Sequence, residues 1–233
     1  MPRRRNWAAL PCRLRSVADS APTITVLAGT NGAGKSSIGG ARLEAAHAPF
    51  YNPDVETRQL TAANPAMTLD EANAAAWGIG RERLETAIES RTSFNFETTL
   101  GGATIARLLT TAHAKGLRVR VWYCGLRDAD LHIARVRARV LRGGHHIEEK
   151  KIRERFDASR NNLCSILPSI DELVLHDNSG EADPDAGREP RPVQLLHLRD
   201  GRILHRESTI PAWAKPIVAV ALSLAKPNWT ADA

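Results

Sequence analysis

A glycine-rich segment carries the residues of this 233-residue chain best suited to chemistry, Gly29-Thr30-Asn31-Gly32-Ala33-Gly34-Lys35-Ser36. It matches the pattern G-x-x-x-x-G-K-S/T at all four fixed positions. In that pattern the glycines let backbone N–H groups turn toward phosphate oxygens, and the following helix adds the positive end of its dipole. Lys35 can reach the β- and γ-phosphates, and the Ser36 hydroxyl can hold Mg²⁺. We predict that this P-loop, with Ser37 directly after it, binds a nucleoside triphosphate such as ATP.

A second candidate is the carboxylate of Asp54, which lies 18 residues beyond Ser36 and directly after a short strand predicted at residues 50–52. Ligands of open α/β sheets bind at the carboxyl ends of strands. A carboxylate there could accept the proton of a hydroxyl group that receives a phosphoryl group. Alternatively, Asp54 caps the next helix in Asn52-Pro53-Asp54-Val55-Glu56. Its position alone favours neither interpretation.

The segment Phe94-Asn-Phe-Glu-Thr-Thr-Leu100 has the same form, a strand whose last residues are polar. We expect Glu97, Thr98 and Thr99 to present acceptor and hydroxyl groups to a sugar or a nucleotide. The alternative is an ordinary strand end whose threonines cap the helix that begins near residue 102.

Three arginines, Arg135, Arg139 and Arg142, recur at i, i+4 and i+7 on a helix predicted over residues 128–142 and therefore share one face. Arginine is suited to bidentate contacts with phosphate. The same helix is expected to have a separate apolar face, which comprises Leu131, Ala134, Ala138 and Leu141.

A glycine pair, Gly143–Gly144, follows this helix and could act as a hinge before His145, His146 and the next helix, which carries Arg153 and Arg155. A two-helix lid that closes over ATP would exclude water, which competes as a phosphoryl acceptor. The alternative is a solvated basic face, but the P-loop favours the lid. The two histidines have no third ligand at metal spacing, so we predict no zinc site.

The elements that must position these residues alternate along the chain. Short apolar runs predict strands at residues 23–28, 50–52, 92–97, 117–124 and 173–176, and residues 194–206 predict a hairpin around Asp200–Gly201. Helical patterns occupy residues 36–47, 67–90, 105–116, 128–142, 149–164 and 211–224, and Glu181–Pro192 is a polar loop. This alternation predicts an α/β domain with a mostly parallel sheet.

Composition restricts the class of protein. A hydrophobic fraction of 42% excludes intrinsic disorder for most of the chain, and three unpaired cysteines argue against a disulfide framework and fit a cytoplasmic protein. No apolar run is long enough to span a membrane. The net charge of +6 first suggests nucleic-acid binding. However, residues 1–22 carry +4 and residues 131–160 carry +5, so the remainder is mildly acidic and nucleic acid becomes an unlikely partner.

Several segments together resemble the zeta-toxin-like P-loop kinases, in the branch often described as predicted ABC-type ATPases. They are LAGTNGAGKSS (27–37), YNPD (51–54), FNFETTL (94–100), RVRARVLRGGHHI (135–147), IRERF (152–156) and HDNS (176–179). The signature helix of ABC ATPases and the N-K-x-D motif of GTPases are both absent. The resemblance covers residues 23–179 in the order of the family.

The resemblance implies an adenylate-kinase-like parallel sheet flanked by helices, with a helical lid at about residues 131–160, in one domain over residues 23–224 behind a basic extension at residues 1–22. The implied activity is transfer of the γ-phosphate of ATP, with Mg²⁺, to a hydroxyl of a UDP-amino-sugar. Carried over by position, Lys35 and Ser36 contact phosphate and Mg²⁺, Asp54 is the base, and Glu97 and Thr99 hold the sugar nucleotide. Arg135 corresponds to a phosphate-contacting arginine, and Arg139 or Arg142 supplies a second charge.

The resemblance also implies that a small antitoxin protein blocks the ATP site of a toxin. Many zeta toxins read E-G-T where this chain reads Glu97-Thr98-Thr99, a difference that bears on the acceptor. The alternatives are a kinase for another hydroxyl acceptor, such as a nucleotide or an antibiotic, and a non-catalytic module that binds ATP as a regulatory switch.

Overall fold

A computed structural model of the chain describes residues 21–35, 50–144, 146–180 and 192–226. Several expectations lie outside these residues. They concern the basic extension up to residue 20, Ser36, Ser37 and the helix expected after them, His145, and all but the last residue of the loop expected over Glu181–Pro192.

The described residues form a seven-stranded sheet in the order β2-β3-β1-β4-β5-β6-β7. The strands are β1 (Thr23–Ala28), β2 (Phe50–Tyr51), β3 (Phe94–Thr98), β4 (Arg118–Gly125), β5 (Glu172–Asp177), β6 (Val193–Arg199) and β7 (Arg202–Arg206). The first five strands in spatial order are parallel, while β6 and β7 form an antiparallel hairpin at one edge. The mostly parallel sheet and the C-terminal hairpin predicted from the sequence are therefore confirmed.

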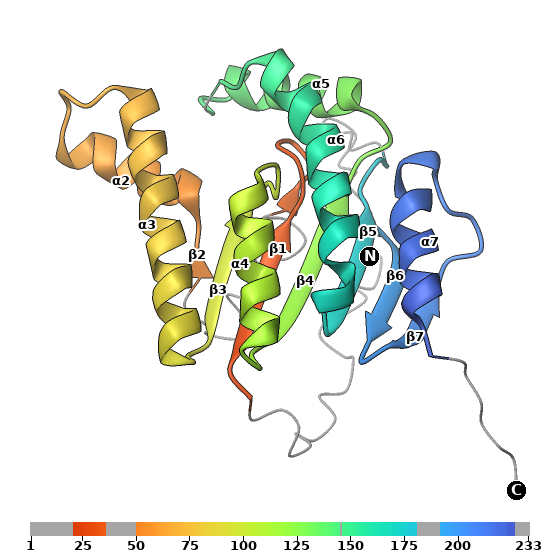
Figure 1. Cartoon of the computed structure of the whole chain (residues 1–233). Coiled ribbons are helices and arrows are strands. Elements are labelled where there is room, and N and C mark those ends of the chain that lie inside the picture. The colour runs from red at the N-terminus through yellow and green to blue at the C-terminus, as the bar shows by residue number, and fades with distance from the viewer. Residues whose placement is uncertain (1–20, 36–49, 145, 181–191, 227–233) are drawn as a thin grey trace, which may run out of the picture.

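Six α-helices connect these strands within the described part of the chain. They are α2 (Pro53–Ala63), α3 (Leu69–Ser90), α4 (Ala103–Ala114), α5 (Ala129–Leu141), α6 (Glu149–Ile166) and α7 (Lys215–Leu224), with short 3₁₀ turns η3 (Leu167–Ser169) and η4 (Ala212–Ala214). Helices α3, α4, α6 and α7 lie side by side along one face of the sheet, whereas α5 lies across its upper edge (Figure 1). That edge is where β1, β3 and β4 end, so α5 lies over the P-loop.

Helix α2 starts where a helix was expected only under the alternative role of Asp54 as a cap, because helical composition was otherwise predicted to resume at Met67. Local capping explains it. The side chain of Asn52 accepts hydrogen bonds from the backbone N–H groups of Asp54 and Val55, and Pro53 occupies the first helical position, where a missing N–H costs nothing. Thr68 and Glu71 then form a reciprocal capping box that starts α3. The helix predicted over residues 67–90 is thus α3, and α2 precedes it as a separate helix.

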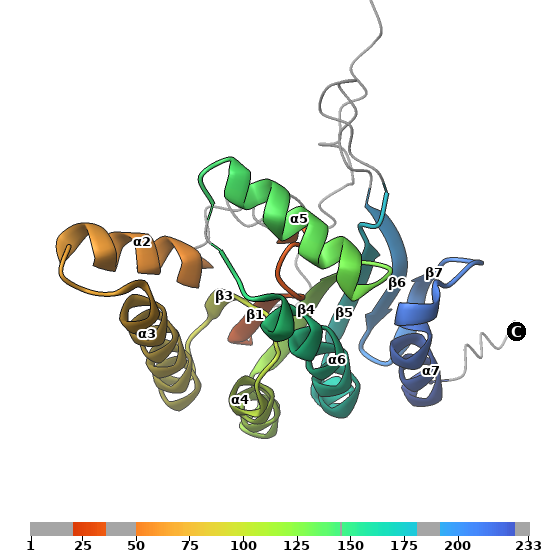
Figure 2. The same cartoon turned by 90° about the horizontal axis from the view of Figure 1, so that it is seen from above.

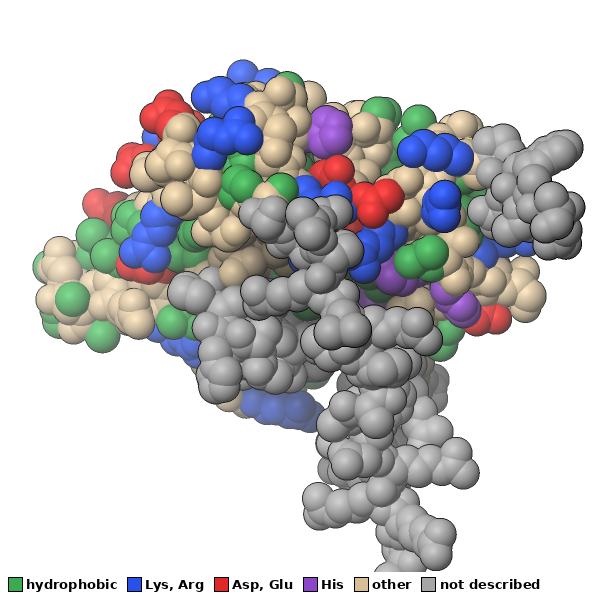
Figure 3. Space-filling model, turned by 90° about the horizontal axis from the view of Figure 1, so that it is seen from below, with side chains coloured by type: hydrophobic (Ala, Val, Ile, Leu, Met, Phe, Trp, Pro, Cys, Tyr) green, Lys and Arg blue, Asp and Glu red, His purple; other side chains and the backbone are tan. Residues whose placement is uncertain are grey.

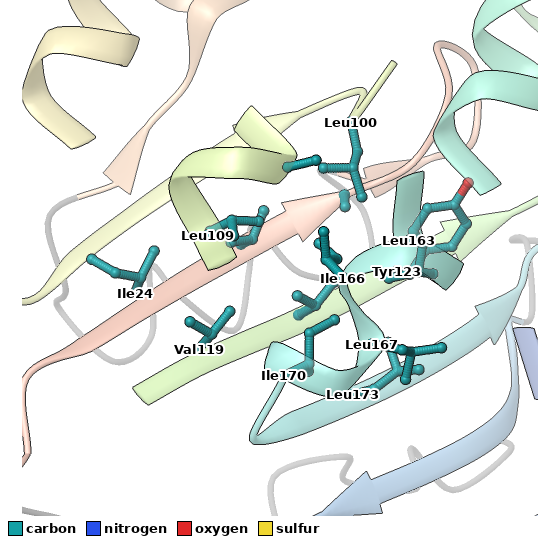
Figure 4. Packing of buried hydrophobic residues seen from close by; sticks show 14 of the residues in the cluster. Ile24, Leu100, Leu109, Val119, Tyr123, Leu163, Ile166, Leu167, Ile170 and Leu173 are labelled. Carbon is teal, nitrogen blue, oxygen red and sulfur yellow. The ribbon is translucent and has the colours of Figure 1, made fainter. Parts of the chain in front are cut away.

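The main core lies between the sheet and these helices (Figure 4). Alternate residues of β1 and β4, including Ile24, Val119 and Tyr123, point from the sheet toward Leu109 of α4 and Leu163 of α6, and all five are buried. Each strand's remaining residues face the opposite side of the sheet. The core fixes the strand ends that carry the candidate site.

The prediction of which residues form the buried apolar face of α5 is wrong. Ala134, Ala138 and Leu141 are exposed, and Leu141 is 90% exposed. The buried positions are His132, Ile133 and Val136, which face the P-loop and Ile152 of α6. The helix thus has two sets of apolar residues at helical spacing. The set that contains Ile133 and Val136 is buried, because it packs against α6.

The face of the molecule seen from below carries charges of both signs among the described residues (Figure 3). Arg118 lies 2.5 Å from Asp200, and Arg120 lies 3.3 Å from Glu172. These basic side chains of the sheet are therefore compensated locally. None of the helices that the structure describes is long and apolar enough to cross a membrane.

Candidate active site

The P-loop connects the end of β1 to Lys35 by a turn that only glycine permits at two places. Gly29 has φ of +140°, and a Cβ atom there would lie 2.1 Å from the carbonyl oxygen of Cys124. Gly32 has φ of +82°, and a Cβ atom would lie 2.8 Å from the carbonyl oxygen of His132. The loop therefore packs directly against the end of β4 and against α5.

Side chains from three other elements hold the loop. The buried Asn178, directly after β5, donates from Nδ2 to the Ala33 carbonyl oxygen at 2.9 Å, and the Cys124 thiol reaches the same oxygen at 2.9 Å. Burial raises the pKa of Cys124 to about 12, so the thiol stays protonated and can donate. His132 Nδ1 lies 2.7 Å from the carbonyl oxygen of Asn31. The loop is thus a rigid cradle rather than a free turn.

Lys35 is almost fully buried at the end of this cradle. Its Nζ donates to the Gly29 carbonyl oxygen at 2.8 Å and lies 3.4 Å from Oε1 of Glu97. Asn52 donates from Nδ2 to the other Glu97 oxygen at 3.3 Å. A carboxylate at the end of β3 therefore compensates the lysine charge at the place where the P-loop pattern puts phosphate oxygens.

A cavity of about 840 Å³ opens beside Lys35. One wall comes from α2 and α3, the floor from the end of β3 and the turn before α4, and the other wall from residues 146–148 and α6. Seen from above, α2 and α3 lie to the left of the P-loop turn, while α5 passes over it (Figure 2). The volume is within the range of cavities that hold small-molecule ligands.

Asp54 lines this cavity, as do Lys35 and Glu97, so the structure brings the predicted base and the P-loop lysine into one space. The alternative that Asp54 caps the helix is wrong, because Asn52 is the N-cap and Asp54 belongs to the first turn of α2. Its carboxylate is 56% exposed and lies 3.7 Å from Nη1 of Arg139.

Thr98 and Thr99 also line the cavity, next to Glu97. Neither caps α4, because Gly102 occupies its N-cap position without a side-chain hydrogen bond. Instead the Thr98 hydroxyl accepts from the backbone N–H of Leu100 at 3.0 Å and fixes the turn after β3. Of the two hydroxyl groups, that of Thr98 thus has a structural role in the turn.

The three arginines of α5 have different surroundings. Arg135 donates from Nη2 to the Gly180 carbonyl oxygen at 2.9 Å, and partial burial lowers its pKa. Arg139 forms an ion pair with Asp54. Arg142 is the exposed C-cap residue. Gly143, with φ of +85°, ends the helix, so the glycine pair has a capping role whether or not it is a hinge.

Arg155 contacts the P-loop directly, although our prediction did not distinguish it from Arg153. Its Nη1 donates to Oδ1 of Asn31 in the P-loop at 2.8 Å, and its side chain lines the cavity. Burial lowers its pKa, and the charge of Asp54 opposes that effect. Arg153 instead pairs with Asp130 on the surface at 2.6 Å. Helical spacing could have predicted the inward position of Arg155, because this residue lies three after the buried Ile152 and four before the buried Ser159 on the same face of α6.

The described residues contain no cluster of three or more His, Cys, Asp or Glu side chains able to hold a metal ion by itself. Mg²⁺ that accompanies a nucleotide needs only one or two protein oxygens, because phosphates and water supply the rest. Glu97 offers a carboxylate next to Lys35. The predicted ligand Ser36 lies outside the described residues.

Several solved structures share this fold. The AvrRxo1-ORF1 protein, solved in complex with AvrRxo1-ORF2 and sulphate ions, has a TM-score of 0.58 and 16% identity, over 88% of this chain and 65% of that chain. This chain thus spans about two thirds of that protein. The same complex was also solved with ATP. The PezAT toxin–antitoxin system of Streptococcus pneumoniae gives a TM-score of 0.51 at 12% identity, over 91% of this chain and 81% of that chain. The chain thus shares the fold of these proteins, and its mostly parallel sheet flanked by helices agrees with the predicted α/β class.

Sequence comparison identifies the family. An uncharacterized protein of Haemophilus influenzae is 31% identical over 128 residues, which is 55% of this chain and 88% of that protein. The family model described as Zeta toxin matches residues 9–183, well over half of the chain and all of the candidate site. The chain belongs to the zeta toxin family.

Proposed function

We propose that this protein is an ATP-dependent kinase that transfers the γ-phosphate to a hydroxyl group of a UDP-amino-sugar. The observation that carries the proposal is that one cavity joins Lys35 of the P-loop to two carboxylates, Asp54 and Glu97, at neighbouring strand ends. A triphosphate site and a base next to it are the two requirements for phosphoryl transfer to an alcohol.

The triphosphate occupies the P-loop, residues 29–37. Lys35 leaves the Gly29 carbonyl oxygen and Glu97 to contact the β- and γ-phosphates. Ser36 would hold Mg²⁺ together with the phosphates, and the bound ion would supply neutralisation of the charge that develops on the transferred group. Arg155 is bonded to Asn31 and is already positioned at the loop. It would reach the same phosphates as Lys35.

Asp54 accepts the proton of the acceptor hydroxyl. The acceptor oxygen then forms a bond to the γ-phosphorus, the bond from that phosphorus to the β,γ-bridging oxygen breaks, and ADP leaves with the bonding electrons. Arg139, 3.7 Å from Asp54, orients the carboxylate. Glu97, Thr98 and Thr99 form the floor of the acceptor side, and the Thr99 hydroxyl is the one we expect to bind the sugar.

Residues 131–160 act as a lid in a single kinase domain over residues 23–224. The small cluster of Ile133, Val136 and Ile152 joins α5 to α6, so the two helices would move together. Closure would bring Arg135, Arg139 and Arg142 nearer the phosphates and exclude water from them.

We further propose a toxin role with a small antitoxin protein as partner. The family, and the toxin–antitoxin system among the structures of similar fold, support this proposal. The enzyme would act in the cytoplasm, where ATP and sugar nucleotides occur, and neither a membrane nor a nucleic acid is required.

The test is an assay of the full chain with ATP, Mg²⁺ and a panel of UDP-sugars, nucleotides and aminoglycosides, read as acceptor-dependent release of ADP. We expect a UDP-amino-sugar to be the best acceptor. A different best acceptor would retain the kinase and reject the UDP-amino-sugar. Binding of ATP without turnover on any acceptor would support a regulatory module instead.

The Asp54→Asn variant tests the base, with Asp130→Asn as its control, because Asp130 is 78% exposed and pairs with Arg153 away from the cavity. We expect Asp54→Asn to lower kcat by about 10²–10⁴-fold, whereas Asp130→Asn retains it. Full turnover by Asp54→Asn would reject the assigned base.

A further inference from the structure

Trp77 is a large apolar side chain left half exposed in the wall of the cavity. It is 50% exposed, and it lies on α3 on the face that also carries Asn73 and Arg81, both of which line the cavity. Residues 73, 77 and 81 follow one another at intervals of four, so they form one stripe along the helix. An exposed tryptophan inside a ligand-sized cavity offers a flat apolar surface to whatever fills it.

The indole ring is supported from its own helix. The guanidinium carbon of Arg81 lies 5.8 Å from the centroid of the Trp77 ring, and Arg81 donates from Nη1 to both carboxylate oxygens of Glu85 at 2.9 Å. The arginine is therefore held in position by Glu85 and restrains the ring beside it. A restrained aromatic surface loses little conformational freedom when a ligand stacks on it.

We propose that Trp77 is a specificity-determining residue that stacks on a nucleobase carried by the phosphoryl acceptor. This inference rests on the proposed kinase function and assigns the part of the cavity that lies beyond the reacting hydroxyl. An acceptor with such a flat ring would be selected over a sugar phosphate that lacks it.

The position of Trp77 favours the acceptor over ATP. Trp77 shares the wall formed by α2 and α3 with Asp54, the proposed base, whereas Asn31 and Lys35 of the P-loop line the cavity from a different element. The carboxylates of Asp54 and Glu97 can accept hydrogen bonds from acceptor hydroxyl groups, and basic side chains that also line the cavity, among them Arg81 and Lys151, can contact the diphosphate of a sugar nucleotide. The volume of about 840 Å³ also leaves room for more than a single sugar ring.

The experiment compares two probes that share a sugar 1-phosphate, of which only the first also carries a uridine monophosphate group with its base. They are UDP-N-acetylglucosamine and N-acetylglucosamine 1-phosphate, each titrated calorimetrically into the full chain saturated with Mg²⁺ and the non-hydrolysable analogue AMP-PNP, which occupies the P-loop. The variants are Trp77→Ala, Trp77→Phe and, as control, Leu204→Ala, because Leu204 is 56% exposed on β7 outside this cavity.

We expect the wild-type chain to bind UDP-N-acetylglucosamine more tightly than the sugar phosphate. Trp77→Ala should weaken UDP-N-acetylglucosamine by about ten- to a hundred-fold, as base–aromatic stacking predicts, and leave the sugar phosphate unchanged. Trp77→Phe should retain part of the affinity, and Leu204→Ala all of it. The affinity for AMP-PNP, measured first, should be the same in every variant.

Four results overturn the inference. Equal binding of the two probes by the wild-type chain, or no binding of either, shows that no base is recognised. If Trp77→Ala loses affinity for both probes equally, the side chain has a general structural role. If its affinity for UDP-N-acetylglucosamine is unchanged, the exposed ring serves another contact, such as one with a protein partner. Acceptor-dependent ADP release in the same preparation distinguishes these failures from failure of the kinase proposal.

Discussion

Asp54 and Arg139 form an ion pair that joins the first turn of α2 to the last turn of α5, with 3.7 Å between Oδ2 and Nη1. The two side chains are 56% and 38% exposed, so the pair contributes little to stability. Its significance is its location, because it links the candidate base on one wall of the cavity to the helix that covers the P-loop.

We predict that Arg139→Gln lowers kcat by about tenfold or more, because Asp54 loses the group that orients it, while the free energy of unfolding changes by at most about 1 kcal/mol. The matched control is Arg137→Gln on the same helix, since Arg137 pairs with Glu149 on the surface. Urea unfolding and steady-state kinetics of both variants make the comparison. Equal kinetic effects of the two substitutions would remove any special role for Arg139.

The buried pair of Lys35 and Glu97 leads to a second prediction. Glu97→Gln removes the carboxylate charge that compensates Lys35, while the hydrogen bond from Lys35 to the Gly29 carbonyl oxygen stays in place. We expect the nucleotide-free variant to lose about 1–3 kcal/mol of stability. Bound phosphates restore the compensation, so Mg²⁺·AMP-PNP should raise the Tm of Glu97→Gln by more than it raises that of the wild type.

Calorimetric melting with and without the analogue measures this difference. Glu149→Gln serves as control, because its partner Arg137 is 68% exposed and the loss of such a pair costs little. If the analogue raises the Tm of Glu97→Gln and of the wild type equally, then Glu97 does not compete with phosphate for Lys35.

The order of elements was predictable because buried parallel strands are apolar runs. The apolar runs at residues 23–28 and 117–124 indicate buried strands, because strands and helices alternate along this chain. The position of the P-loop then indicates which ends of the strands face the ligand. From there it followed that Asp54 and Glu97 would share an edge of the sheet. In the structure, both residues line the same cavity.

The contacts across the cavity were not predictable, because they depend on how separate helices pack. Nothing in the spacing of α5 distinguishes the arc of Leu131, Ala134, Ala138 and Leu141 from the arc of Ile133, Val136 and Val140; Ile152 of another helix makes the choice. The same packing turns Arg139 toward Asp54 and Arg155 toward Asn31. Long-range side-chain pairs of this kind leave no local pattern in a single sequence.

Arg155 leads to a third prediction, with Arg153 as an internal control two residues away. Arg155→Ala removes a guanidinium group that is bonded to the P-loop and lines the cavity, whereas Arg153→Ala removes a surface ion pair. We expect kcat to fall by about 10²–10³-fold in the first variant, because an arginine at the transferred phosphate stabilises transition-state charge, and to stay near wild type in the second. Steady-state kinetics with saturating ATP decide, and similar values for both variants would place Arg155 outside the chemistry.

His132 leads to a prediction about pH. Its ring is buried between the P-loop and Phe156, and Nδ1 lies 2.7 Å from the Asn31 carbonyl oxygen, which can only accept, so Nδ1 carries a hydrogen. Burial lowers the pKa of His132 to about 4, and the nearby Lys35 and Arg135 act in the same direction. The folded chain thus keeps the ring neutral, while the unfolded chain protonates it near its ordinary pKa of about 6.5.

Because the unfolded state binds the extra proton, the stability contributed by neutral His132 is complete above about pH 6.5 and is lost as the pH falls toward 4, by an amount of the order of 3 kcal/mol. His132→Asn keeps a donor for the Asn31 carbonyl oxygen but cannot titrate. We therefore expect the wild type to lose more stability than His132→Asn between pH 6.5 and pH 4, measured as the free energy of urea unfolding. The exposed His205 supplies the control, since His205→Asn should follow the wild-type curve. Parallel curves for the wild type and His132→Asn would mean that the ring titrates alike in the folded and unfolded chains, and the tight contact between α5 and the P-loop would then need another explanation.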